Sequence, residues 1–138
     1  MANLKRFLTP KSIAIYGGSW AMNVIEQLQI SKYNGEIWPV HPNRSDIGGI
    51  PCFADTQSLP GVPDAAFIGV NRELSIEIIG ELNSIDAGGA ICFASGYREA
   101  NEEHQIKNSG YLDLQDQLVS AAGNMPMLGP NCYGYLNY

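Results

Sequence analysis

The sequence has few basic residues. It contains 8 Lys and Arg against 14 Asp and Glu, which gives a formal net charge of -6 at pH 7. Proteins that bind nucleic acid nonspecifically neutralise phosphates with Lys and Arg, and membrane surfaces attract basic segments in the same way. The composition therefore argues against nucleic-acid and membrane partners. An anionic small molecule stays compatible with it, because backbone N–H groups at a helix N-terminus bind anions.

Long apolar segments are absent as well. No run approaches the roughly 20 residues of a membrane-spanning helix, and residues 1–12 lack the apolar core of a secretory signal. The three cysteines, Cys52, Cys92 and Cys132, are odd in number and widely spaced, which disfavours a disulfide framework and a zinc cluster. No Ser-His-Asp set, paired carboxylates or metal-ligand cluster can be argued from the spacing. We expect a cytoplasmic protein, with no catalytic or metal-binding residue assigned.

Glycine and proline are frequent, with 15 and 8 residues in a chain of 138. This favours one domain, residues 1–138, with many tight loops. Short apolar segments that are typical of buried strands occur at 12–16, 36–40, 65–70, 90–93 and 126–128, with a short extra strand at 50–53. Apolar residues recur at helical spacing in 21–28, 74–82 and 111–122. The alternation predicts a Rossmann-like, doubly wound α/β fold, a mainly parallel sheet with helices on both faces.

Ligands of such sheets bind outside the carboxyl ends of the strands, so the strand-to-helix loops are the candidate site. In the first loop, Gly17 and Gly18 allow a sharp turn close to a phosphate, and Ser19 is placed to cap the next helix and to donate to that phosphate. The third glycine of a dinucleotide-binding fingerprint is replaced by Met22. A tight turn with a capping serine is the alternative interpretation of this loop.

The second loop carries His41, Pro42, Asn43 and Arg44. A nicotinamide-binding domain usually has Asp or Glu there to hold the ribose, whereas a basic residue suits a phosphorylated ribose or a pyrophosphate. A Pro-Asn turn with a solvated arginine explains the same residues. Pro39, just before this loop, indicates an edge strand or a strand end.

The remaining loops are less specific. Asn71, after Val70, is expected to cap the helix that begins near Glu73, which explains it without a ligand. Small residues around Ser95 and Gly96 allow close approach of a ligand, although a simple turn needs the same residues. Asn131 and Cys132 lie in an unusual small and polar run after the last strand, where Cys132 has no neighbouring base that would make it a nucleophile.

Taken in order, these segments resemble the N-terminal CoA-binding domain of the NDP-forming acyl-CoA synthetases, relatives of the succinyl-CoA synthetase alpha subunit. The resemblance runs from about Phe7 to Asn137. It is carried by residues 8–15 leading into 17–19, and by 38–43, 63–66, 95–100 and 129–134. The last of these, Gly129 to Gly134, is the most telling.

The resemblance implies a coenzyme A site built from the loops. It places Gly17, Gly18 and Ser19 at the nucleotide phosphates, and Trp20 where it either crowds the phosphates or stacks on the adenine. It places the turn at Pro42 and Asn43, with Arg44, by the phosphate or ribose of the nucleotide. It places Val70 and Asn71 along the path of the nucleotide or pantetheine, with Ser95 and Gly96 farther along that path. Asn131 and Cys132 are placed toward the thiol.

The resemblance also implies that the chain is part of an acid-thiol ligase. In that family a phosphoryl group passes through a histidine of the following domain, and an ATP-grasp domain binds the nucleotide. Neither fits in 138 residues, and His41 and His104 do not match the phosphorylated position. The chain is then an excised N-terminal domain or a partner subunit that needs downstream ligase and ATP-grasp parts. A non-catalytic CoA sensor or scaffold and an NAD(P)-binding oxidoreductase domain are the alternatives.

Overall fold

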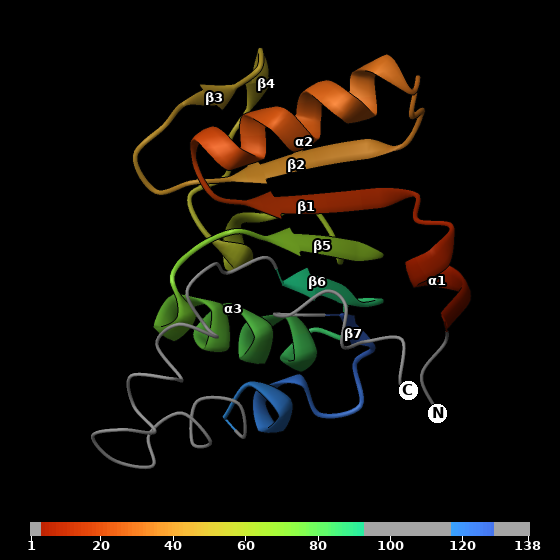
Figure 1. The fold of residues 1–138 in the computed structure, drawn as a ribbon, viewed down its shortest axis with the longest axis vertical. Helices are drawn as coiled ribbons and strands as arrows, with labels where there is room; N and C mark the ends of the chain where they lie inside the picture. The colour runs from red at the N-terminus through yellow and green to blue at the C-terminus, as the bar shows by residue number, and fades with distance from the viewer. Residues whose placement is uncertain (1–3, 93–116, 129–138) are drawn as a thin grey trace, which may run out of the picture.

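The protein is described from a computed structural model that covers residues 4–92 and 117–128, except for the side chain of Ser19. Its main feature is a five-stranded sheet in the order β2-β1-β5-β6-β7 (Figure 1). Every neighbouring pair in this sheet is parallel. The strands are β1 (Ser12–Tyr16), β2 (Glu36–Val40), β5 (Ala65–Ile68), β6 (Ala90–Cys92) and β7 (Met127–Leu128). The predicted Rossmann-like α/β fold is confirmed.

The inner strand β1 sends alternate side chains to two separate apolar clusters. Ile13 and Ile15 pack with α2 (Ser19–Ile30), and Ala14 and Tyr16 pack with α3 (Arg72–Ser84) and with the helical backbone at 117–122. All five residues of β1 are buried. A parallel strand covered on both faces is apolar throughout, which is the pattern that predicted this strand from the sequence.

Helix α2 begins at the residue that was expected to cap it, one residue earlier than predicted. Ser19 is its first helical residue, and Gly18 is the N-cap, with no side-chain hydrogen bond to the helix. The prediction that Ser19 caps this helix is therefore wrong. Glycine is an acceptable N-cap residue, and it brings no side chain to the start of the helix.

The outer strand β2 shows why Pro39 is tolerated. The Pro39 carbonyl accepts a 2.8 Å hydrogen bond from the Phe53 N–H, on the side away from β1. The nitrogen of Pro39 faces the same outer side, so the missing N–H costs the sheet no ladder bond. The prediction of an edge strand is confirmed.

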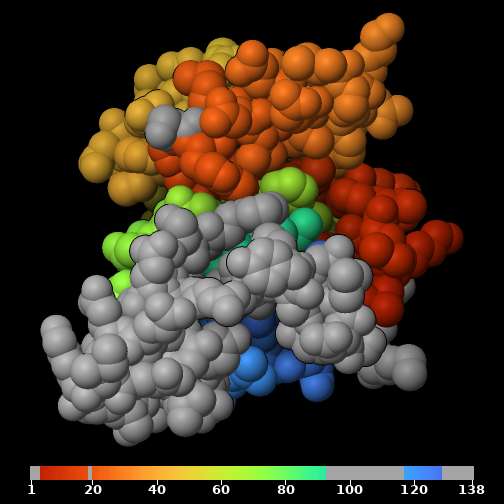
Figure 2. All heavy atoms as spheres, in the orientation of Figure 1, coloured from red at the N-terminus to blue at the C-terminus, as the bar shows by residue number. Residues whose placement is uncertain are grey.

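A small hairpin follows β2 and lies beside α2. It consists of β3 (Asp46–Ile47) and β4 (Ile50–Pro51), joined by Gly48 and Gly49 with φ of 60° and 83°. Ile47 is buried against α2, and Figure 2 shows the gold atoms of this region against the orange atoms of α2. The expected strand at 50–53 is thus found as β4 followed by the single bridge at Phe53.

Two short helices have no counterpart among the predicted elements. One is α1 (Leu4–Leu8), which lies at the amino end of the sheet (Figure 1), and the other is the 3-10 turn η1 (Thr56–Ser58). Arg6 of α1 binds the Asp64 carboxylate at 2.8 Å, and the Lys11 N–H donates to the same carboxylate at 2.9 Å. These bonds tie α1 to the start of β5. Within the described part of the chain, no helix has the length and apolarity to cross a membrane.

Candidate functional site

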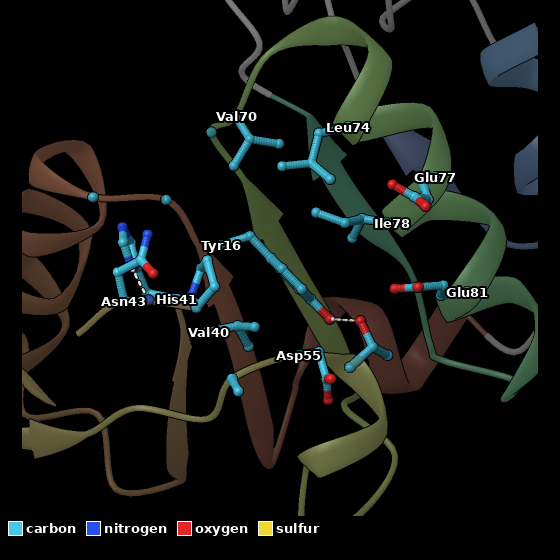
Figure 3. A pocket seen from close by; sticks show the side chains of 16 residues that line it. Tyr16, Val40, His41, Asn43, Asp55, Val70, Leu74, Glu77, Ile78 and Glu81 are labelled. Atoms are coloured by element: carbon cyan, nitrogen blue, oxygen red, sulfur yellow. Dashed lines mark hydrogen bonds between the residues drawn. The ribbon is translucent and has the colours of Figure 1, made fainter. Parts of the chain in front are cut away.

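A pocket of about 450 Å³ lies at the carboxyl ends of β1, β2 and β5 (Figure 3). The loops after these strands form one side, and α3 and the segment before η1 form the other. Five predicted site residues line it, namely Gly17, Gly18, Pro42, Asn43 and Val70. The lining residues that were not assigned from the sequence are Tyr16, Val40, His41, Ala54, Asp55, Thr56, Gly69, Leu74, Glu77, Ile78 and Glu81.

Gly17 lets the loops after β1 and β5 approach closely. Its φ is 142°, a conformation that side chains rarely adopt, and a Cβ atom there would lie 3.0 Å from the Gly69 carbonyl oxygen. The Gly69 N–H in turn donates to the Tyr16 carbonyl at 2.9 Å. The glycine is therefore required by this backbone approach, whether or not a ligand is bound.

Two basic side chains converge on Gly18 at the start of α2. Measured from the point where a Cβ on Gly18 would sit, Arg44 Nη2 is 3.7 Å away and His41 Nε2 is 3.9 Å away. The Asn43 N–H donates to His41 Nδ1 at 3.0 Å, so a neutral His41 carries its hydrogen on Nε2. A helix N-terminus, an arginine and an N–H donor together form a corner that attracts anions.

Trp20 does not line the pocket. Its indole ring packs on Gly69, where a Cβ atom would lie 2.6 Å from Trp20 Cε3. In a standard dinucleotide-binding fingerprint the third glycine makes room between the helix and the strand. Here the large residue is on the helix and the glycine is at the end of the strand, so Gly69 provides that room.

Asn71 acts as a helix cap. Its Oδ1 accepts a 2.8 Å hydrogen bond from the Leu74 N–H at the start of α3, and it is not among the pocket residues. The predicted capping role is confirmed, with the helix beginning at Arg72. Arg44 also lies outside the lining set, beside Gly18. Ser95, Gly96, Asn131 and Cys132, like the side chain of Ser19, lie outside the described residues.

A buried pair of hydroxyl groups forms the far end of the pocket. Tyr16 Oη and Thr56 Oγ1 are 2.8 Å apart, and the two residues are only 3% and 4% exposed. Burial raises the pKa of Tyr16, the hydrogen bond with Thr56 lowers it, and the negative charges of Glu81 and Asp55 raise it further. The phenol therefore stays protonated and serves as a hydrogen-bonding group.

Sequence reasoning missed most of the wall on the α3 side. Leu74 and Ile78 were recognised as the apolar face of a helix, but that spacing does not tell a core face from a pocket face. Glu77 and Glu81 are one turn apart, which was the available signal that two carboxylates share a face. Asp55 and Thr56 reach the pocket only because the chain from β4 returns beside β2.

Comparison with known proteins identifies the family of this chain. A family model described as CoA binding domain matches residues 11–138. The chain is 28% identical over 144 residues to the trans-feruloyl-CoA synthase FCS1 of an unknown prokaryotic organism, with 98% of this chain and 19% of that protein covered. It is 26% identical over 140 residues to acetate–CoA ligase (ADP-forming) II of Archaeoglobus fulgidus, with 98% and 20% covered.

A solved structure of similar fold is the dinucleotide-forming acetyl-coenzyme A synthetase 1 of Ca. Korarchaeum cryptofilum in complex with phosphate and ADP. The TM-score is 0.80 at 25% identity, over 95% of this chain and 28% of that chain. The chain spans about a fifth of the length of the curated relatives it matches. The match over nearly all of its residues shows that this chain belongs to the CoA-binding domain family and is homologous to a segment of the ADP-forming acyl-CoA synthetases.

Proposed function

We propose that the pocket at the carboxyl edge of the sheet binds coenzyme A, with the phosphates at Gly17 and Gly18 and the nucleoside between Val70 and the β2 loop. The observation that carries this is the corner at Gly18, where Arg44 and His41 meet the start of α2. A volume of about 450 Å³ falls within the range of about 300–1,000 Å³ that is usual for small-molecule sites.

The individual residue roles follow from this placement. Backbone N–H groups at Gly18 and Ser19 bind the pyrophosphate at the start of α2, and Arg44 binds a phosphate as a charge-assisted donor. The turn at Pro42 and Asn43 contacts the ribose. The residues proposed to follow the pantetheine toward its thiol are Val70, Asn71, Ser95, Gly96, Asn131 and Cys132, and Trp20 supports the wall from behind Gly69.

We propose further that this domain supplies the coenzyme A site of an acyl-CoA synthetase. The phosphohistidine relay and the ATP-grasp site of such an enzyme belong to other domains or to a partner subunit. The net charge of -6 supports a small anionic ligand held by backbone groups rather than nucleic acid. The free thiols of Cys52 and Cys92 support a reducing, cytoplasmic setting.

A ligand-dependent unfolding experiment tests the coenzyme A site. A ligand that binds only the native state raises the free energy of unfolding, by about 2.7 kcal/mol at a concentration of 100 Kd. We expect coenzyme A to raise the Tm of the 138-residue chain, with NADH at the same concentration as the comparison. No shift at millimolar coenzyme A, or a larger shift with NADH, would contradict the proposal.

The same assay tests Arg44. Because its guanidinium lies beside Gly18 rather than in the pocket wall, we expect it to bind the 3′-phosphate of coenzyme A. Arg44→Ala should weaken coenzyme A about tenfold, the effect of one charge-assisted hydrogen bond, and dephospho-coenzyme A much less. Equal losses for the two ligands would assign Arg44 to the pyrophosphate instead.

A further inference from the structure

The polar side chains in and around the pocket are segregated, with hydrogen-bond donors at one end and carboxylates at the other. His41 and Arg44 lie at the Gly18 end, and the carboxylates of Asp55, Glu77 and Glu81 line the pocket at the opposite side. In Figure 3, Glu77 and Glu81 project from α3 on one side of Tyr16, and His41 lies on the other. This arrangement favours phosphates at Gly18 and an uncharged group that can donate hydrogen bonds beside the carboxylates.

The acidic end is a built hydrogen-bonding surface. Asp55 Oδ1 accepts from both the N–H and the hydroxyl of Ser58, at 2.9 Å and 2.8 Å, which fixes the carboxylate at the start of η1. The buried Tyr16 and Thr56 hydroxyls share one hydrogen bond. Each hydroxyl has one hydrogen and only one of the two is used between them, so the other is left to donate.

We infer that this end of the pocket reads the amino group of the ligand's base, with Glu81 and Asp55 as the acceptors that select adenine over a 6-oxopurine. This inference rests on the proposed coenzyme A site and adds a basis for its specificity. Glu81 is the main candidate, because it is half-buried on α3 and faces the Tyr16 hydroxyl. The influence of the Glu81 and Asp55 charges on the pKa of Tyr16 supports their proximity to that hydroxyl.

The donor and acceptor patterns of the two bases explain the selection. Adenine presents an amino donor beside the N1 acceptor, which matches a carboxylate next to a hydroxyl hydrogen. Hypoxanthine presents an O6 acceptor beside an N1–H donor. An ionised carboxylate can only accept hydrogen bonds, so it repels O6, and the polar groups at this end are left unsatisfied. The pocket therefore penalises a deaminated ligand even when the phosphates bind normally.

The test compares coenzyme A with its deaminated form, in which inosine replaces adenosine, by calorimetric titration of the 138-residue chain. We expect coenzyme A to bind about tenfold more tightly, the scale of one hydrogen bond to a charged group. In Glu81→Gln the amide can donate to O6, so the preference should fall to about threefold or less, mainly through tighter binding of the deaminated ligand. Asp55→Asn should also reduce the preference for coenzyme A over its deaminated form.

Glu26→Gln is the matched control, because Glu26 is exposed on α2 and does not line the pocket. It should retain the full preference. Equal affinity of the natural chain for the two ligands would overturn the inference and leave the coenzyme A site intact. A preference that persists unchanged in both folded variants, Glu81→Gln and Asp55→Asn, would overturn it as well. Failure of both ligands to bind the natural chain would instead overturn the proposed function.

Discussion

Gly17 is the residue on which the geometry of the loop at Gly18 depends most. Gly17→Ala combines a φ of 142° with a Cβ 3.0 Å from a backbone oxygen, and strained backbone of this kind costs about 1–3 kcal/mol. We expect the variant to lose that much free energy of unfolding in urea and to bind coenzyme A more weakly, because the loop has to move away from Gly69.

Gly49 offers the control for this substitution. It also has a positive φ, 83°, but no heavy atom lies within 4 Å of a Cβ placed there. Gly49→Ala should therefore cost only the backbone contribution of about 1–2 kcal/mol and leave ligand affinity unchanged. Equal effects of the two substitutions would show that the close approach to Gly69 is unimportant.

Most single residues whose role has a local reason were predicted well, although Ser19 is the first residue of α2 and not its cap. The glycines after β1, the cap at Asn71 and the proline of an edge strand each follow from backbone chemistry that the sequence displays directly. The fit of Trp20 onto Gly69 depends on two segments that meet only in the folded protein. For that reason Trp20 was predicted at the ligand, whereas its ring packs behind the pocket wall.

At the level of secondary structure elements, the N-terminus of α3 can be tested separately from the ligand. Asn71→Ala removes the acceptor of the Leu74 N–H and should reduce the free energy of unfolding by about 1 kcal/mol. Asn71→Asp keeps an acceptor oxygen and a favourable charge at the helix start, so it should retain stability. Urea unfolding of the three proteins checks this.

Coenzyme A titration of the same variants separates two roles. If Asn71 serves only as a cap, Asn71→Asp keeps the affinity of the natural chain. A large loss of affinity in a stable Asn71→Asp protein would instead place the amide in contact with the ligand.

The five strands of the main sheet were predicted within one or two residues, because a short apolar run bounded by turn residues is typical of a buried parallel strand. The elements that were missed, α1, β3 and η1, are short. Helix α1 is held by Arg6, through bonds to Asp64 and to the Asp86 carbonyl, and η1 is held by the Asp55 cap. Neither contains an apolar period long enough to identify a helix.

At the level of the whole molecule, the ion pair between Arg6 and Asp64 joins the N-terminal segment to the sheet. Burial acts to raise the pKa of Asp64, but the hydrogen bonds from Arg6 and from the Lys11 N–H, together with their charges, hold it below its usual value of 3.8. A lowered pKa in the folded state stabilises the protein above pH 3.8, and this contribution is lost as the pH falls through the folded-state pKa.

Asp64→Asn should therefore destabilise the protein at pH 6, and the difference from the natural chain should shrink below about pH 4. Urea unfolding between pH 3 and pH 7 measures both. Glu26→Gln, an exposed carboxylate on α2, is the control and should follow the natural chain throughout. A stability difference for Asp64→Asn that does not change with pH would indicate a packing effect rather than loss of the charge.

The candidate site was predicted only in part, because its walls come from segments that are far apart in the sequence. The loops after the strands can be recognised from the sequence, because a sharp turn needs glycine and other turn residues. Five of the residues predicted in these loops line the pocket. The opposite wall comes from α3 and from the segment before η1. Which of their side chains line the pocket depends on how these segments pack beside the strands in the folded protein. Tyr16 is an example, because the sequence predicted it in a strand but did not predict that its hydroxyl lies at the far end of the pocket.

Helix α1 lies at the amino ends of the strands (Figure 1), and the pocket is lined by residues at and after their carboxyl ends. Leu8, at the end of α1, is 72% exposed and makes no contribution to either apolar cluster. If the protein is coupled to a biosensor surface through that position, the entrance of the pocket should therefore face the flowing solution. Immobilisation there gives direct access to association and dissociation rates without masking the region that is being measured.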